Sequence, residues 1–364
     1  MNGELINALS QLKKERAIPT EVLLEAIEMA LISAYKRHFS GHQNVAVTID
    51  RKTGSVQVLA KKMVVSEVQD PQNEILLSTA LTDFPDAREG EELELEVTPK
   101  DFGRIAAQTA KQVIVQKLKE AEREMVFQEY TSQQGDVITG LIHRQENRNL
   151  FINLGKAEAI LPLSEQVPTE HFRPGQRIKG YVLEVKKTTR GPQIVISRTC
   201  PGFLKRLFEL EVPEIAEGIV EIKSLAREAG YRSKIAVRSR EKNIDPVGSC
   251  VGYKGSRVQA IVEELRGEKI DIVLWSENAA EFVSAALSPA RSLKVTLNEE
   301  EKHAYAIVPD RQLSLAIGRE GQNARLVAKL TGWKIDITSE SLAKAKEGEK
   351  VGAEEREKVA KEGS

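Results

Sequence analysis

The stretch that decides the fold is Val251-Gly252-Tyr253-Lys254-Gly255, which is followed by an amphipathic segment and closes with Lys269-Ile270-Asp271-Ile272. A second copy reads Ile317-Gly318-Arg319-Glu320-Gly321 and closes with Lys334-Ile335-Asp336-Ile337. The separation of the two copies along the chain is one residue shorter at the closing strand than at the glycines. We therefore expect the helices between these two points to differ in length by one residue. A unit repeated in this way predicts one small module used twice.

Each copy places two glycines at the start of an expected helix. Glycines in a tight turn leave backbone N–H groups and the positive end of the helix dipole uncovered, and such groups bind phosphate. In KH modules a G-x-x-G loop of this kind clamps the backbone of single-stranded nucleic acid. A turn whose glycines only solve a backbone problem is the alternative for a single copy, and two matched copies disfavour it.

Basic side chains in and after each loop suit contact with phosphate. The carboxylate of Glu320 at the tip of the second loop would repel phosphate, so we expect the first loop to bind RNA more strongly. The predicted RNA-binding residues of the loops are Gly252, Tyr253, Lys254, Gly255, Arg257, Gly318, Arg319, Gly321, Gln322 and Arg325.

Composition limits the class of protein. With 364 residues, of which 41% are hydrophobic, the chain can form several domains. No stretch approaches 18 consecutive apolar residues, so we expect no membrane span. Cys200 and Cys250 show neither metal-ligand spacing nor a disulfide framework, which is typical of a cytoplasmic protein. His38 and His42 lack a third ligand, and we expect no metal and no cofactor.

Charge is distributed unevenly along the chain, although the net charge is only −1. Residues 1–134 hold 16 basic and 21 acidic side chains, whereas residues 135–200 hold 10 basic and six acidic ones. Local basic surface determines phosphate affinity more than the whole-chain sum does. The segment 1–134 is therefore not expected to bind RNA by itself.

The first third of the chain mixes helical and strand patterns. Leu5, Ile6, Leu9 and Leu12 recur at helical spacing, and a second helix is expected with Thr20 as its N-cap. Strands are expected over residues 44–50, 55–59, 61–68 and 91–97, with a hairpin turn at 51–54. A long helix is expected over residues 101–130. On it Arg104, Gln108 and Lys111 form one polar stripe, which is either a solvated face or a binding face.

From residue 135 the pattern changes to short strands at regular spacing. They are expected over residues 135–143, 148–154, 157–161, 176–186 and 192–197. Five short strands in so few residues predict a small OB-fold barrel. Alternation buries Leu150 and Ile152 and puts Phe151 on the outer face, either as a stacking platform for a base or packed under a loop.

The remaining segments belong to the repeated module. A helical approach is expected over residues 213–230, a strand over 233–239, a helix over 279–286 and a hairpin of strands over 293–297 and 304–308. Residues 339–364 are rich in Lys and Glu without a sustained apolar face, so we expect a frayed helix or a disordered tail.

Four stretches resemble one bacterial family closely. They are Thr109–Ile114, Asn243–Gly248, Ile270–Trp275 and Ala316–Asn323. With the domain order, they resemble the NusA family of transcription termination/antitermination factors over about residues 1–340. The resemblance implies a multidomain α+β fold: an α/β amino-terminal domain (1–134), a five-stranded OB-fold barrel (135–200), two tandem type II KH domains (201–276 and 277–340) and a charged tail (341–364).

The resemblance also implies a function. Members of this family bind nascent single-stranded RNA, dock on RNA polymerase near the flap of its β subunit, and modulate pausing, intrinsic termination and antitermination with other Nus factors. The stripe of Arg104, Gln108 and Lys111 would then face the RNA exit channel, and we expect a monomer. Barrels of this type commonly stack bases on two aromatics and a histidine; Phe151 matches one position, and Arg148 and Pro162 occupy the others.

No catalytic motif is found in the sequence. It contains no phosphate-binding P-loop, no H-E-x-x-H and no clustered carboxylates of a two-metal nuclease. An RNA-processing enzyme is one alternative, since exoribonucleases carry KH and barrel modules, but the segment before the barrel is too short for their catalytic core. A ribosome-associated RNA-binding protein is another.

Overall fold

The structure is a computed structural model and describes residues 19–39, 44–51, 53–189 and 191–345. The chain divides into two compact units, Met1–Val126 and Phe127–Ser364. The helix expected around residues 5–12 lies outside the described residues, as does most of the expected tail. In the described part, no helix is long and apolar enough to cross a membrane.

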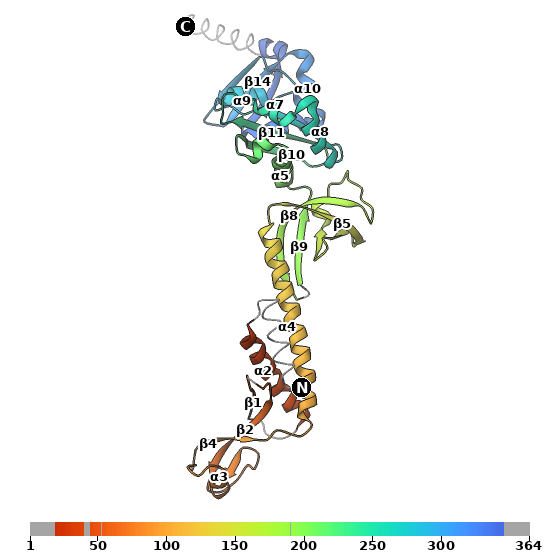
Figure 1. Cartoon of the computed structure of the whole chain (residues 1–364). Helices are drawn as coiled ribbons and strands as arrows, with labels where there is room; N and C mark the ends of the chain where they lie inside the picture. The colour runs from red at the N-terminus through yellow and green to blue at the C-terminus, as the bar shows by residue number, and fades with distance from the viewer. Residues whose placement is uncertain (1–18, 40–43, 52, 190, 346–364) are drawn as a thin grey trace, which may run out of the picture. The chain divides into compact units, whose positions relative to one another are not determined.

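Helices and a hairpin form the body of the first unit (Figure 1). It consists of α2 (Thr20–His38), β1 (Val45–Ile49), β2 (Val56–Val65) and the first part of α4 (Phe102–Ser132). The core residues recur at helical spacing on the helices and alternate on the strands. They are Leu23, Leu24, Ile27, Leu31, Tyr35, Val45, Val47, Ile49, Val58, Ala60, Phe102, Ala106 and Ala110. Both helices and the hairpin predicted for this region are confirmed.

Two details of this body correct the sequence prediction. Pro19, not Thr20, is the N-cap of α2, because its φ of −60° and ψ of 130° already provide the extended conformation of that position. The two strands expected over 55–59 and 61–68 are one strand, β2. Ala60 and Lys61 join them because both residues continue the antiparallel pairing with β4 (Glu92–Glu96).

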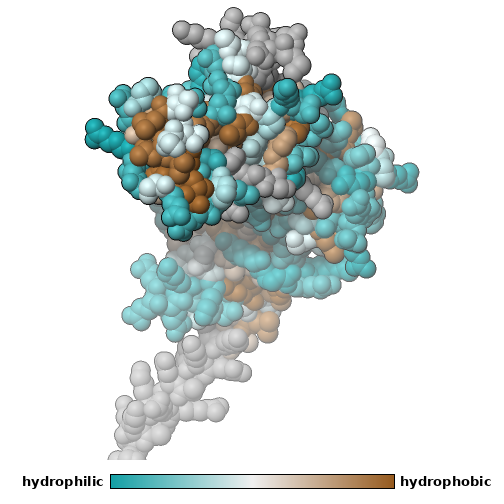
Figure 2. Space-filling model, turned by 90° about the horizontal axis from the view of Figure 1, so that it is seen from below, coloured by the Kyte–Doolittle hydropathy of each residue, from teal (hydrophilic) through white to brown (hydrophobic). Residues whose placement is uncertain are grey.

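The far end of β2 belongs to a small lobe of the first unit. There β2 pairs with β3 (Glu74–Leu76) and with β4, and α3 (Leu77–Asp83) follows β3. A core of Val64, Ala80 and Leu93 joins helix and sheet. Neither β3 nor α3 is expected from the sequence, because elements so short do not reveal a period. Apolar side chains also gather on the outside of the lobe (Figure 2).

A closed β-barrel opens the second unit, with strand order β5-β6-β7-β9-β8. Its strands are β5 (Val137–Glu146), β6 (Asn149–Asn153), β7 (Glu158–Leu161), β8 (Arg177–Thr188) and β9 (Gly191–Ser197). All five predicted strands are confirmed. Leu150 and Ile152 are buried inside, as alternation predicts.

Two modules of the same topology follow the barrel. The first contains α5 (Pro201–Glu211), α6 (Pro213–Ala216), β10 (Val220–Glu228), β11 (Arg232–Ser239), α7 (Pro246–Val251), α8 (Ser256–Glu264) and β12 (Lys269–Leu274). The second contains α9 (Ala279–Ala286), β13 (Lys294–Asn298), β14 (His303–Val308), α10 (Leu313–Ile317), α11 (Gln322–Thr331) and β15 (Lys334–Ser339). In each, the first two strands are antiparallel and the last two parallel.

The difference in length between the copies lies in the turn after the helix, not in the helix as predicted. Helix α11 is one residue longer than α8, although the second copy is the shorter one. Gly332 ends α11 in the left-handed conformation, and β15 begins soon after it. In the first copy, Arg266 and Gly267 both have positive φ, so the turn before β12 is wider.

The helical approach expected over residues 213–230 is wrong for most of its length. Only α6 is helical there, and β10 occupies residues 220–228. A β-bulge between Ile222 and Ser224 shifts the register of β10 against β11. The bulge interrupts the period of two, so the apolar residues do not alternate as in a regular strand.

The two modules share a core. Ala226, Ala236 and Val273, on one face of the first sheet, pack with Val283 of α9 and Leu326 of α11. The opposite face of the first sheet packs on the module's own helices. The first sheet is thus covered on both sides.

Candidate nucleic-acid interface

The two G-x-x-G loops have nearly the same backbone conformation. Gly252 and Gly318 have φ values of 75° and 76°, in a region that favours glycine. Lys254 and Glu320, at the loop tips, have φ values of 50° and 53°. A Cβ on Gly318 would lie 2.8 Å from the backbone nitrogen of Asn323, so the loop packs tightly on the helix that it opens. The sequence repeat is therefore also a structural repeat.

The first loop presents a cation at its tip. Lys254 is exposed, and among the described residues its ammonium contacts no carboxylate; it lies 5.3 Å from the centroid of the Tyr253 ring, which is itself exposed. Arg257, also expected to contact RNA, donates to the Glu214 carboxylate at 2.9 Å and to the Ser249 carbonyl at 2.6 Å. Lys254 is therefore the side chain of this loop that is free to meet a phosphate.

The second loop is more heavily paired. Gln322 Nε2 and Arg325 Nε donate to the Glu228 carboxylate at 2.9 and 3.1 Å. Burial raises the pKa of Glu228, but these hydrogen bonds outweigh it and hold the pKa below its usual range. Arg319 is almost fully exposed and lies 3.6 Å from its neighbour Glu320. Because Glu228 belongs to β10, its hydrogen bonds join the second loop to the first module.

On the barrel, a guanidinium covers the predicted stacking residue. The Cζ of Arg144 lies 4.1 Å from the centroid of the Phe151 ring, because the register places the two residues opposite each other. Glu146 and Glu158 hold Arg144 in place. Arg148 is exposed in the turn between β5 and β6. A flat cation on an aromatic ring can itself stack on a base, so Arg144 is a candidate contact that the sequence did not single out.

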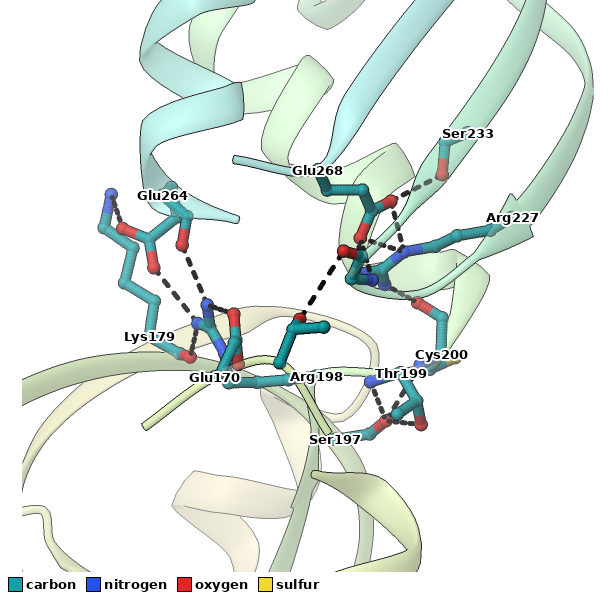
Figure 3. Close-up of polar contacts among 12 residues, drawn as sticks. Glu170, Lys179, Ser197, Arg198, Thr199, Cys200, Arg227, Ser233, Glu264 and Glu268 are labelled. Carbon is teal, nitrogen blue, oxygen red and sulfur yellow. Dashed lines mark hydrogen bonds and ion pairs between the residues drawn. The ribbon is translucent and has the colours of Figure 1, made fainter. Parts of the chain in front are cut away.

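A network of hydrogen bonds around Arg198 links the barrel to the first module (Figure 3). Arg198 is 1% exposed; it donates to both carboxylate oxygens of Glu170 at 2.5 and 2.6 Å and to Glu264 Oε1 at 3.1 Å. It also donates to two main-chain carbonyls. Arg227 and Glu268 form a second buried pair within the module. Arg198, which directly follows β9, thus has acceptors both in the barrel segment and at the end of α8.

The closing strands of the two modules use the same aspartate differently. Asp271 accepts from Arg232 at 2.7 Å and from the buried Lys234 at 2.9 Å. Burial raises the pKa of Asp271, but these two cations outweigh it and lower the pKa. Its counterpart Asp336 is largely exposed and lies 3.0 Å from His303 Nε2. Lys234 also donates to the carbonyl of Ser288, so the first site reaches the second module.

The polar stripe of the first unit lies on α4. Arg104, Gln108 and Lys111 are all exposed, and Gln108 and Lys111 line a shallow hollow along the helix. The structure brings these three side chains onto one face, as their spacing predicts. In the described residues, no group of three His, Cys, Asp or Glu side chains is arranged to hold a metal ion.

Comparison with known proteins assigns the family. The NusA N-terminal domain family matches residues 4–124, the S1 RNA binding domain family 131–197, the NusA-like first KH domain family 198–275 and the second 279–345. The transcription termination/antitermination protein NusA of Halalkalibacterium halodurans is 60% identical over 343 residues, covering 94% of this chain and 90% of that protein. The chain belongs to the NusA family.

Other NusA proteins are similar over the same length. NusA of Bacillus subtilis is 58% identical over 344 residues, covering 94% of this chain and 93% of that protein. NusA of Thermus thermophilus is 43% identical over 377 residues, covering all of this chain and 97% of that protein. The solution structure of the N-terminal domain of NusA from B. subtilis is 55% identical, covers 34% of this chain and 99% of that domain, and has a TM-score of 0.31. The predicted family and its domain order are confirmed.

Proposed function

We propose that this chain is an RNA-binding transcription factor that modulates pausing, intrinsic termination and antitermination. The observation that carries the proposal is the free Lys254 at the tip of a G-x-x-G loop whose backbone recurs in the second module. Its ammonium suits a phosphate of single-stranded RNA. The family membership supports the same conclusion, because the relatives bear the name transcription termination/antitermination protein.

The first loop is proposed as the main phosphate contact. Arg257 donates hydrogen bonds to Glu214, and Gln322 and Arg325 donate to Glu228. Lys254 has no such carboxylate partner among the described residues, so it is available to a phosphate. RNA binding should weaken as salt rises, because phosphate contacts release counterions. Duplex RNA should bind poorly, since these modules accept single strands.

Fluorescence anisotropy with labelled single-stranded RNA tests this proposal on the full chain. Lys254→Asp should weaken binding at least fivefold, and Arg319→Asp should weaken it less. Lys36→Asp, at an exposed position of α2, changes the net charge equally and should have little effect. Equal losses for Lys254→Asp and Lys36→Asp, or tighter binding of duplex RNA, would refute the proposed site.

The amino-terminal unit is proposed to dock on RNA polymerase near the flap of the β subunit. Its excess of acidic side chains disfavours free RNA, while the α4 stripe offers a local patch that could reach RNA in the docked state. Arg104→Ala should reduce pausing by purified polymerase while leaving co-sedimentation with polymerase intact. Co-purification with ribosomal subunits in place of polymerase would favour the ribosomal alternative, and RNA cleavage in the presence of magnesium would favour an enzyme.

A further inference from the structure

Partly exposed apolar side chains lie at α3, in the lobe of the first unit, beside the exposed polar residues Ser78, Thr79 and Thr82. Leu76 and Leu81 are 37% and 42% exposed, and Leu77 and Phe84 are half-buried beside them. In Figure 2, which views the molecule from below, apolar side chains gather on the near face within a hydrophilic rim. Leu81 on this short helix and Leu76 at the end of β3 are therefore accessible to a partner.

The same lobe is strongly acidic. Residues 61–96 hold ten acidic and three basic side chains, so this segment alone is more negative than the whole of 1–134. Of the three basic residues, Lys61 lies 3.6 Å from Glu94, and Lys62 donates to a main-chain carbonyl. Asp83 ends the helix and Asp86 and Glu89 follow it, and the three carboxylates have no ion pair or hydrogen bond within the described residues.

We propose that this surface docks a cationic amphipathic helix of a partner protein. An apolar stripe on that helix would cover Leu76 and Leu81, and its Lys and Arg side chains would meet Asp83, Asp86 and Glu89. Apolar burial supplies affinity in such a groove-type contact, and complementary charge sets orientation and partner choice. Nucleic acid is excluded because its phosphates would meet the carboxylates. The surface is thus separate from the RNA interface and does not rest on the proposed function.

A labelled peptide tests the proposal with the full chain. The probe is a peptide of Leu and Lys, about five helical turns long, with the leucines on one helical face, and its binding is measured by fluorescence anisotropy. Leu81→Gln should weaken binding about tenfold, because it removes one apolar contact. Met29→Gln, at an exposed apolar position on α2, is the matched control and should bind like the wild type. Neutralising Asp83, Asp86 and Glu89 together should weaken binding and flatten its salt dependence.

Several results would overturn the proposal. One is that Leu81→Gln and Met29→Gln bind the probe equally well. Others are that the wild type binds a peptide with Glu in place of Lys, or a scrambled peptide without the apolar stripe, as tightly as the probe. Displacement of the probe by single-stranded RNA would also contradict the proposal. Sedimentation that shows a wild-type dimer dissociated by Leu81→Gln would assign the surface to a second copy. If Leu81→Gln lowers the unfolding midpoint, Leu76→Gln replaces it in the same comparison.

Discussion

Replacing Arg198 by methionine should destabilise the second unit by about 3–5 kcal/mol, the usual cost of leaving a buried charge without its partner. The structure accounts for a loss of stability of this magnitude, because the Glu170 side chain is only 1% exposed and both of its carboxylate oxygens accept from Arg198. Two main-chain carbonyls also lose a donor. The methionine side chain fills part of the volume, so the loss is mainly electrostatic.

Urea unfolding followed by tryptophan fluorescence measures the effect. Both tryptophans, Trp275 and Trp333, lie in the KH modules, so the signal reports on the second unit. With a slope of about 3 kcal/mol/M, the midpoint should fall by about 1–1.7 M. Arg206→Met is the control, since Arg206 pairs with Asp136 and Glu209 at a partly exposed position and should cost at most about 1 kcal/mol.

A double variant separates charge from packing at this junction. Arg198→Met combined with Glu170→Met removes both charges and should recover most of the lost stability, because an apolar pair needs no partner. The reasoning fails if Arg198→Met costs no more than Arg206→Met. It also fails if the double variant is as unstable as the single one, since the loss would then come from shape.

Three further outcomes are expected. The lowered pKa of Asp271 means that its ionised form stabilises the fold above about pH 4, the pKa of an unfolded aspartate, and that this contribution is lost as pH falls through the folded pKa. Acid unfolding of Asp271→Asn should therefore lack this loss. Burial raises the pKa of Cys250 to about 12, so iodoacetamide should label Cys250 only when the protein unfolds. The less buried Cys200 should be labelled sooner, and mass spectrometry of the two labelled sites checks this order. Glu228→Gln should tighten RNA binding about two- to fivefold, because Arg325 then loses its carboxylate partner and can contact phosphate. Weaker binding in the anisotropy assay would contradict this.

Local pattern was enough to predict the repeated modules and the barrel. The glycines and the closing strand of each copy determine a short helix-to-strand unit, and the five barrel strands show alternation over their own length. The boundaries of α9 coincide with the predicted range because Asn278 caps its start and apolar residues define its face.

Hydrogen bonds between residues far apart in the chain could not be predicted from the sequence. Glu228 and Arg325 are 97 positions apart, and Glu214 and Arg257 are 43 apart, so no local period connects them. The contact of Arg144 with Phe151 depends on a bulge in β5 that sets the register. The bulge in β10 breaks the alternation by which that strand could have been predicted. These tertiary details decide which cations in and after the two loops have carboxylate partners.

The shared core of the KH modules has a consequence for synthesis of the chain. Ala226, Ala236 and Val273 are covered by helices that are translated later, and the carbonyl partner of Lys234 arrives with Ser288. A nascent chain that has emerged only as far as β12 therefore exposes a flat face of small apolar residues and one ammonium without its full set of acceptors. The first module should acquire its native stability only after α11 has left the ribosome, which makes the interval between the two copies the period of greatest exposure to proteases and chaperones.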